Sequence, residues 1–380
     1  MNILVICHYG MYQNLTYSFV HNQIREYAAM GHRVRVLIPN GIGKTGRDGS
    51  RIGKAVVVSA VDGVELVDLR YLTLSNYGDK GFNTASAIAA VRTHWKKVMG
   101  DFAPDVIHAH TLGFDSEIGA WLKEKFHCPL VLTTHGSDTE IPMRSGGAEM
   151  LRRTCDKADL VVAVSSKLMK TLSACGTKTP LSCVLDGFVF RGGGTEAEKR
   201  PYHMLQVSNL VPSKHVDVTI RALARLRETY PQMTLEIVGQ GGQRDELASL
   251  CRELGVEDCV SFTGQVPNQT VFEKMQQASY FVMPSKPEGF GIVYLEAMSC
   301  RCVTIGTEGE GIADVIVSGE NGFLVSADDA EAIAEGIASC IEDPDKAAAM
   351  AQRGYQSAME LTWSTNAKKY IDIFKELLQC

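Results

Sequence analysis

The sequence has no long apolar segment, no clustered cysteines and no excess of basic charge. Its 380 residues contain no stretch near the roughly 20 apolar residues that a membrane-spanning helix requires. The formal net charge is −6, whereas proteins that hold nucleic acid by bulk electrostatics carry a large basic face. We therefore expect neither a membrane-spanning protein nor a nucleic-acid-binding one.

The eleven cysteines are scattered and lack CxxC spacing. This pattern is typical of reduced, mostly buried thiols and predicts a cytoplasmic protein. We attribute the close pair Cys300 and Cys302 to packing. His108 and His110 alternate at the end of a predicted strand without a third ligand at metal spacing, so no metal site is predicted. The opening segment, MNILVICHYG, has no basic region before its short apolar run and predicts a first buried strand.

Short apolar runs alternate with segments of helical period along the whole chain. Strands are predicted at 2–7, 33–38, 105–110, 129–134, 159–164, 203–208, 234–239, 259–264, 280–284, 302–306 and 322–325. This alternation is typical of parallel sheets covered by helices on both faces. A chain of this length also favours two domains, and two domains imply a cleft.

The alternation is interrupted at 186–202, where three consecutive glycines and a charged run predict a linker. We therefore predict an α/β fold with two doubly wound, Rossmann-like domains. The N-terminal domain is expected at 1–185 and the C-terminal domain at 203–362. A helical tail follows at 363–380, and whether it packs back on the N-terminal domain stays open.

The stretch PSKPEGFGIVYLEAMS at 284–299 follows a predicted strand, where ligands bind in open parallel sheets. It places Glu288 in a loop and Glu296 inside the next helix. Gly289 and Gly291 allow close approach of the backbone, and the helix N-terminus offers N–H groups to an anion such as a diphosphate. The two carboxylates would accept from hydroxyls of sugar and ribose rings. The alternative is a capping glutamate and an exposed helical one.

Three other loops hold candidate binding residues. Lys214 stands at the start of a predicted helix, where lysines often hold phosphate. Gly309 and Gly311 lead from another strand into a predicted helix. His135, directly after a strand in TTHGSD, is a candidate to contact a sugar or phosphate. The alternatives are a solvated lysine and a structural histidine. The segment GQGGQRDEL at 239–247 matches a dinucleotide fingerprint only weakly and predicts a strand-to-helix turn.

Together these motifs resemble the family-4 retaining glycosyltransferases, which have the GT-B fold. EGFGIVYLE is similar to the family's E-x7-E signature, SNLVPSKHVD to its GRL-x-x-x-K-G segment, EGEGIADVI to its GG-x-x-E loop and VLDGFV to its PNGV segment. The resemblance covers essentially the whole chain and is strongest from 203 to 326. It implies two Rossmann-like domains that face a cleft, with an acceptor-side N-terminal domain and a nucleotide-sugar-binding C-terminal domain.

Carried over by position, the resemblance implies that Glu288 contacts hydroxyls of the transferred sugar and that Glu296 contacts the ribose. It implies that Lys214 neutralises the diphosphate. The backbone amides that would assist Lys214 are those of Gly289, Phe290 and Gly291. No cofactor and no metal is expected, because fixed donors stabilise the leaving diphosphate in this family.

The remaining site residues include departures from the family pattern. His135 would sit beside the donor sugar on the acceptor side, and the loop around Gly10 would close over the donor. Gly10 is a single glycine where many members have two. Asn209 occupies a donor-side position that is usually arginine, and Asp314 replaces the usual glutamate of the loop that contains Gly309.

The resemblance implies a retaining, metal-independent hexosyl- or N-acetylhexosaminyltransferase of class EC 2.4. The expected donor is a UDP sugar, or next a GDP sugar, and the expected acceptor is a saccharide or a lipid-linked saccharide. The GEGI form of the third loop is similar to transferases of exopolysaccharide and capsule synthesis. Two alternatives stay open: a GT-B epimerase, and a non-catalytic sugar-nucleotide-binding subunit of a polysaccharide assembly complex, which the missing arginine at Asn209 favours.

One segment bears on location. The predicted helix 84–99 combines Trp95 with Arg92, Lys96 and Lys97. Such a helix could lie on an anionic membrane surface and hold the protein peripherally at the inner face of the plasma membrane. The alternative is an ordinary amphipathic helix of a cytoplasmic protein.

Overall fold

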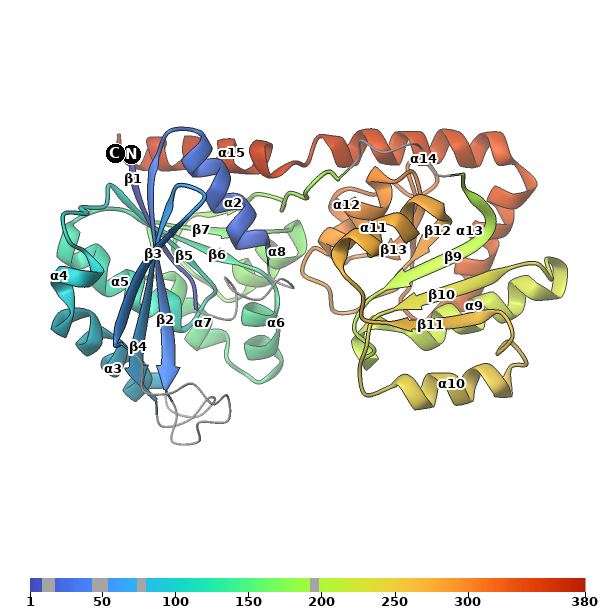
Figure 1. Ribbon diagram of the computed structural model, residues 1–380, viewed down its shortest axis with the longest axis horizontal. Helices are drawn as coiled ribbons and strands as arrows, with labels where there is room; N and C mark the ends of the chain where they lie inside the picture. The colour runs from blue at the N-terminus through green and yellow to red at the C-terminus, as the bar shows by residue number, and fades with distance from the viewer. Residues whose placement is uncertain (9–17, 43–53, 74–79, 192–197, 380) are drawn as a thin grey trace. The chain divides into compact units, whose positions relative to one another are not determined.

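The computed structural model describes residues 1–8, 18–42, 54–73, 80–191 and 198–379. The chain divides into two compact units, one formed by Met1–Gly187 with Trp363–Cys380 and the other by Phe188–Thr362. Each unit is built around its own sheet, with helices on both faces of that sheet (Figure 1). The prediction of two Rossmann-like α/β domains with a C-terminal helical tail is confirmed.

The N-terminal unit contains, within the described residues, an eight-stranded sheet in the order β3-β4-β2-β1-β5-β6-β7-β8. Its strands are β1 (Asn2–Ile6), β2 (Arg33–Ile42), β3 (Val56–Val61), β4 (Val64–Leu72), β5 (Val106–His110), β6 (Leu130–Thr134), β7 (Leu160–Ala163) and β8 (Leu181–Cys183). All neighbours pair in parallel except β3 and β4, which are antiparallel. The central strands β5 and β6 are buried along their whole length, as expected when helices cover both faces.

The last helix of the chain belongs to this unit. The helices here are α2 (Ser18–Ala29), α3 (Lys80–Thr93), α4 (Trp95–Val98), α5 (Phe114–Phe126), α6 (Ser137–Arg144), α7 (Ala148–Cys155), α8 (Ser166–Ala174) and α15 (Trp363–Leu377). Tyr370 and Phe374 of α15 lie in the same apolar core as Ile24 and Tyr27 of α2. The Tyr27 and Phe374 rings meet edge to face with centroids 5.8 Å apart. Burial of these side chains joins the end of the chain to the first unit.

The C-terminal unit contains, in the described part of the chain, a six-stranded parallel sheet in the order β11-β10-β9-β12-β13-β14. Its strands are β9 (Arg200–Val207), β10 (Thr234–Val238), β11 (Val260–Gly264), β12 (Ala278–Val282), β13 (Val303–Thr307) and β14 (Phe323–Val325). Its helices are η2 (Pro212–Lys214), α9 (Val216–Thr229), α10 (Arg244–Glu253), α11 (Asn268–Gln277), α12 (Ile292–Ser299), η3 (Gly311–Asp314), α13 (Ala330–Glu342) and α14 (Pro344–Met359). Among the helices described in either unit, none combines the length and apolarity needed to cross a membrane.

The structure differs from the sequence-based expectation in several elements. The antiparallel pair β3 and β4 was not predicted, although β3 has the apolar sequence VVVSAV; five of its six residues are exposed in the structure. The helix predicted at 84–99 is divided into α3 and α4 at His94, whose ψ of 21° departs from helical geometry. The loop at 306–316 leads into the single 3₁₀ turn η3 instead of a full helix. β9 begins at Arg200, ahead of the strand predicted at 203–208.

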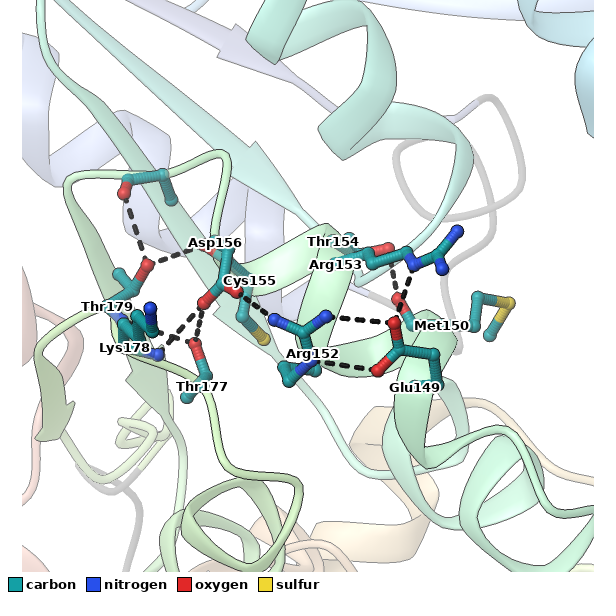
Figure 2. A network of polar contacts seen from close by, with 11 residues as sticks. Glu149, Met150, Arg152, Arg153, Thr154, Cys155, Asp156, Thr177, Lys178 and Thr179 are labelled. Carbon is teal, nitrogen blue, oxygen red and sulfur yellow. Dashed lines mark hydrogen bonds and ion pairs between the residues drawn. The ribbon is translucent and has the colours of Figure 1, made fainter.

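α7 is connected to the segment before β8 by hydrogen bonds around Asp156 (Figure 2). The Asp156 carboxylate accepts from Thr177 Oγ1 at 2.7 Å and from the backbone N–H of Lys178 at 2.9 Å. It also accepts from Arg152 at 2.8 Å. The Thr177 hydroxyl, followed by the Lys178 amide, holds the pKa of Asp156 below its ordinary value. Glu149 also binds Arg152, but its bonds stay within α7.

Replacing Asp156 by alanine should destabilise the protein by about 1–2 kcal/mol, because bonds to a backbone amide and a hydroxyl are lost. For a unit of this size, that corresponds to a fall of roughly 2–8 °C in Tm by scanning calorimetry. The control is Glu149→Ala, which removes an exposed pair within one helix and should leave Tm close to that of the parent protein. Equal losses in the two variants would contradict an anchoring role for Asp156.

Candidate active site

Three loops of the C-terminal unit leave the carboxyl ends of the adjacent strands β9, β12 and β13. The first loop carries Lys214, the second Glu288 and the third Glu310. The carboxyl ends of neighbouring parallel strands meet at one edge of a sheet, and the strand order reverses between β9 and β12. The topology therefore brings these three loops together.

Lys214 and Glu288 form an ion pair between the first two loops. Lys214 Nζ lies 2.5 Å from Glu288 Oε2 and donates to Ser285 Oγ at 3.2 Å. Ser285 is fully buried and donates in turn to Glu288 Oε2 at 3.0 Å. The exposed side-chain fractions of Lys214 and Glu288 are 21% and 15%, so water screens their interaction less than that of an open surface pair. The structure thus joins two of the predicted site residues.

Glu310 is a site residue that the sequence analysis did not identify. The residue is 6% exposed, and its carboxylate accepts a hydrogen bond from the backbone N–H of Glu288 at 2.6 Å. The next residue, Gly311, lies so close to the second loop that a Cβ there would come 2.1 Å from Gly289 O. The motif comparison directed attention to Asp314, which is exposed at the end of η3. The sequence signal that could have pointed to Glu310 is its position between two glycines, Gly309 and Gly311.

The backbone amides at the start of α12 have unused hydrogen-bonding capacity. Within the described residues, the N–H groups of Gly289, Phe290 and Gly291 donate to no protein acceptor. Gly291 is the N-cap of α12 and has a φ of +83°, a conformation that glycine adopts without strain. The helix N-terminus adds partial positive charge at the same place. These amides suit an anion such as a phosphate.

Glu296 lies inside α12, and its carboxylate has no hydrogen bond or ion pair within the described part of the chain. Burial raises its pKa to about 7, with partial opposition from the charge of Arg191. The side chain is half-buried, and a carboxylate in that setting without a protein partner favours a ligand-binding role. The other two predicted donor residues make fewer contacts: the Asn209 side chain is exposed after β9, and Gly309 occupies an exposed turn with a φ of +70°.

The glycine-rich turn after β10 has a packing role. A Cβ at Gly239 would lie 1.9 Å from Ser208 O, and one at Gly241 would lie 2.3 Å from Leu210 O. The turn therefore packs directly on the loop that follows β9, and α10 begins at Arg244. This arrangement is the strand-to-helix turn that the sequence predicts.

In the N-terminal unit, His135 follows β6 and lies against His110 of β5. His110 Nδ1 and His135 Nε2 are 3.0 Å apart, and the two rings are stacked. Burial lowers the pKa of His135 to about 4, although Asp138 opposes this shift. Burial also lowers the pKa of His110 well below its ordinary value. Both imidazoles are therefore neutral near pH 7, and one proton occupies the hydrogen bond between them.

The second nitrogen of each ring is unused. His135 Nδ1 and His110 Nε2 are buried and have no hydrogen-bond partner among the described residues. One of these two nitrogens must carry a proton, so the pair offers one donor and one acceptor. Asp138 holds this loop by accepting from the N–H groups of His135 and Leu112 at 3.1 and 2.8 Å. Gly10, the remaining predicted residue, lies outside the described residues.

The geometry gives no indication of a metal centre in the part of the chain that the structure describes. There, no group of three or more histidine, cysteine, aspartate or glutamate side chains is arranged to hold a metal ion. His108, which the sequence analysis considered beside His110, binds Thr133 Oγ1 at 2.8 Å through Nε2.

Two family models together match most of the chain. Residues 194–357 match the model described as Glycosyl transferases group 1, and residues 18–187 match the model described as Glycosyltransferase Family 4. A GDP-mannose-dependent alpha-(1-6)-phosphatidylinositol monomannoside mannosyltransferase of Mycolicibacterium smegmatis is 29% identical over 264 residues, which are 64% of this chain and 69% of that protein. A D-inositol 3-phosphate glycosyltransferase of Acidothermus cellulolyticus is 26% identical over 304 residues, which are 72% of this chain and 67% of that protein.

Solved structures share the fold over the full length. Sucrose-phosphate synthase from Thermosynechococcus elongatus superposes with a TM-score of 0.79 at 18% identity, covering 100% of this chain and 99% of that one. Anabaena HepE, in complex with UDP and glucose, superposes with a TM-score of 0.74 at 20% identity, covering 99% of each chain. From its two matched domains and its fold, the chain belongs to the GT-B glycosyltransferases that combine a family 4 domain with a group 1 domain.

Proposed function

We propose that this glycosyltransferase moves a sugar from a nucleotide-diphosphate sugar to a saccharide or lipid-linked acceptor, with retention of anomeric configuration. The observation that carries the proposal is the Lys214, Glu288 and Ser285 cluster beside three unused backbone amides. A cation and free N–H groups suit a diphosphate, whereas a carboxylate suits the hydroxyls of the attached sugar. One edge of the sheet therefore offers partners to both parts of a nucleotide sugar.

In the proposed reaction, the bond between the anomeric carbon and the diphosphate oxygen breaks while the acceptor oxygen bonds to the same face of that carbon. The proton of the acceptor hydroxyl passes to the leaving oxygen. Negative charge develops on the diphosphate, where Lys214 and the amides of Gly289, Phe290 and Gly291 would stabilise it. This scheme needs no metal, and Glu288 acts as a hydrogen-bond acceptor and not as a nucleophile.

Glu296 is proposed to bind the ribose of the donor. Its carboxylate has no protein partner within the described residues, so ribose hydroxyls would supply the hydrogen bonds that it lacks. Asn209 and Gly309 would line the donor in the loops on either side. His135 is proposed to contact the transferred sugar, because its buried Nδ1 has no hydrogen-bond partner within the described residues.

We propose a UDP sugar as the first candidate donor and a GDP sugar as the second. The Anabaena HepE structures are described as complexes with UDP and with UDP-glucose, and the mycolicibacterial relative is named as GDP-mannose-dependent. We propose a hexose or an N-acetylhexosamine as the transferred sugar. We also propose a role in exopolysaccharide or capsule synthesis; a relative in Streptomyces coelicolor, of which the match covers 26%, is named an exopolysaccharide phosphotransferase. A lipid-linked acceptor would bring the protein to the inner membrane surface.

Replacing Glu288 by glutamine should lower kcat by about 100-fold or more, because the sugar loses a charged acceptor at its reacting end. UDP affinity by calorimetry should change little, since Lys214 and the backbone amides remain. Turnover is measured with a panel of UDP and GDP sugars chosen by thermal shift. The control is Glu308→Gln, an exposed glutamate of the neighbouring loop.

Turnover of the Glu288→Gln variant within a few-fold of the parent enzyme would rule out the sugar-contact role. Saturable donor binding by the parent protein without transfer to any acceptor would instead favour the non-catalytic subunit. Conversion of the donor without an acceptor would favour an epimerase.

Nucleotide binding should depend on pH through Glu296. Burial raises its pKa to about 7, so the carboxyl is largely protonated below pH 7 and ionised above it. Ribose hydroxyls bind the ionised form best, so UDP affinity should rise by up to about tenfold between pH 6 and pH 8. Without ligand, the stability of the fold depends on pH in the opposite direction. The stabilising contribution of Glu296 is lost as pH rises from the pKa of the unfolded chain, 4.5, through the folded pKa of about 7.

The Glu296→Gln variant tests this assignment in calorimetric titrations with UDP across the same pH range. The variant should bind UDP more weakly at pH 8 and lose the rise in affinity. Titration of the UDP phosphates affects both proteins equally, so the ratio of their affinities isolates Glu296. A ratio that does not change with pH would contradict contact between the carboxylate and the ribose.

A further inference from the structure

A second candidate ligand site lies on the N-terminal unit between α4 and α5. A pocket of about 430 Å³ is lined by Arg92, Trp95, Trp121, Glu124 and Lys125. The chain has three tryptophans, and two of them meet here with ring centroids 6.3 Å apart. Both indoles are only partly buried, which leaves part of each ring available to a ligand.

This pocket is separate from the loop that carries His135. α5 starts at the carboxyl end of β5 and runs back along the sheet, so Trp121 and Lys125 lie toward the amino ends of the strands (Figure 1). Trp95 opens α4, the short helix that precedes β5. His135 follows the carboxyl end of β6, so it lies at the other end of the strands of the same sheet. A ligand in the pocket would therefore not occupy the candidate active site.

Cations lie over the tryptophan rings. The Arg92 guanidinium is 5.2 Å from the centroid of a Trp121 ring, and Lys125 Nζ is 4.6 Å from that of Trp95. A ligand that carries both an acidic group and an apolar face can use both kinds of group at once. Its acid would pair with the cations, and its apolar face would pack on the indoles.

The charge of the cluster opposes that of the chain. Lys96 and Lys97 are exposed on α4 beside the pocket, and Glu124 is the one carboxylate among its lining residues. Within the described residues, Arg92, Lys96, Lys97 and Lys125 have no carboxylate partner, whereas Lys123 of the same helix α5 pairs with Asp159 at 2.8 Å. The whole chain has a net charge of −6, so it has more carboxylates than basic side chains. Within the described residues, none of these carboxylates forms an ion pair with the four cations. Unpaired cations gathered around one pocket favour an anionic ligand.

We propose that this pocket binds an anionic saccharide, that is, a sugar chain with uronate or phosphate groups. The C–H face of a sugar ring packs on an indole, and guanidinium and ammonium groups bind its acidic substituents. Behind the pocket, Trp95 also stacks on Phe126 with centroids 5.6 Å apart, which fixes the orientation of the indole. Insertion into a membrane requires protruding apolar groups on a longer amphipathic helix, and α4 has four residues.

The inference that this saccharide is the acceptor chain rests on the proposed function. The inference that the pocket binds an anionic saccharide does not. A transferase that extends an acidic polysaccharide would gain from a second site, because a chain held at two places dissociates more slowly. The growing end would occupy the active site while an earlier part of the chain occupies the pocket.

Tryptophan fluorescence of the full chain tests the proposal without any donor or turnover. Trp363 is buried, so changes on titration report on Trp95 and Trp121. The probes are tetragalacturonate and a heparin tetrasaccharide at low ionic strength, with maltotetraose as the neutral control. Arg92→Gln combined with Lys125→Gln should weaken binding of at least one anionic probe by about tenfold. The matched control combines Lys170→Gln with Lys178→Gln, two exposed lysines elsewhere on this unit.

Saturable binding of an anionic probe, weakened in the first double variant but not in the control, supports the proposal. Absence of binding by both anionic probes, equal binding of maltotetraose, or equal loss in the two double variants would overturn it.

Flotation with phosphatidylglycerol-containing vesicles tests membrane binding separately. Flotation that depends on Arg92 and Lys125, without any saccharide binding, would assign the cluster to a membrane and overturn the proposal. The UDP affinity of the same variants should be unchanged. A failure of saccharide binding can therefore be distinguished from a failure of the proposed function.

Discussion

Lys214 and Glu288 are 74 residues apart in the sequence, and their side chains form the ion pair on which the candidate site depends. The pair requires that β9 and β12 be neighbours in the sheet. A backbone hydrogen bond from Lys286 N to Ser213 O at 2.8 Å joins the same two loops. A change in the pairing of these strands would separate the charged atoms and the buried Ser285 hydroxyl together. The central strands of the C-terminal sheet therefore set the chemistry of the site.

Groups without protein partners mark the places where a ligand can bind. Folded proteins pair nearly all of their buried polar groups, because an unpaired one costs the full desolvation penalty. In the C-terminal unit the amides of 289–291 and the half-buried Glu296 carboxylate have no protein partner within the described residues. In the N-terminal unit the exceptions include the second nitrogens of His110 and His135. In each unit these groups lie at or just beyond the carboxyl ends of parallel strands, where doubly wound folds bind ligands.

The aromatic and basic pocket differs from these sites in both position and chemistry. It lies at the amino ends of the strands and uses exposed cations and partly buried indoles, with Arg92 and Lys125 over the rings of Trp121 and Trp95. The active-site candidates instead use backbone amides, a buried carboxylate and neutral imidazoles. The proposed transfer reaction gives a role to the amides, the carboxylate and the imidazoles, and it gives none to the pocket.

Apolar runs and motif spacing were sufficient to predict most of the fold. Strands buried on both faces appear as continuous apolar runs, so the two Rossmann-like units could be recognised without any knowledge of contacts. Lys214, Gly289 and Gly291 were predicted as site residues because loops after such strands form the edge at which ligands bind. The strand β3 was missed although it is an apolar run, and the helix predicted at 84–99 proved to be two helices because the backbone turns at His94.

The sequence by itself determined the two sheets and the loops that carry Glu288 and Lys214, because burial and strand-to-helix order are local properties of the chain. Only the tertiary structure decided which side chains meet. Glu310 binds a backbone amide 22 residues away, and a backbone amide has no residue-type signal. His110 and His135 pair because β5 and β6 are adjacent strands. Parallel neighbours are separated by helical crossovers of variable length, so no fixed spacing in the sequence records these contacts.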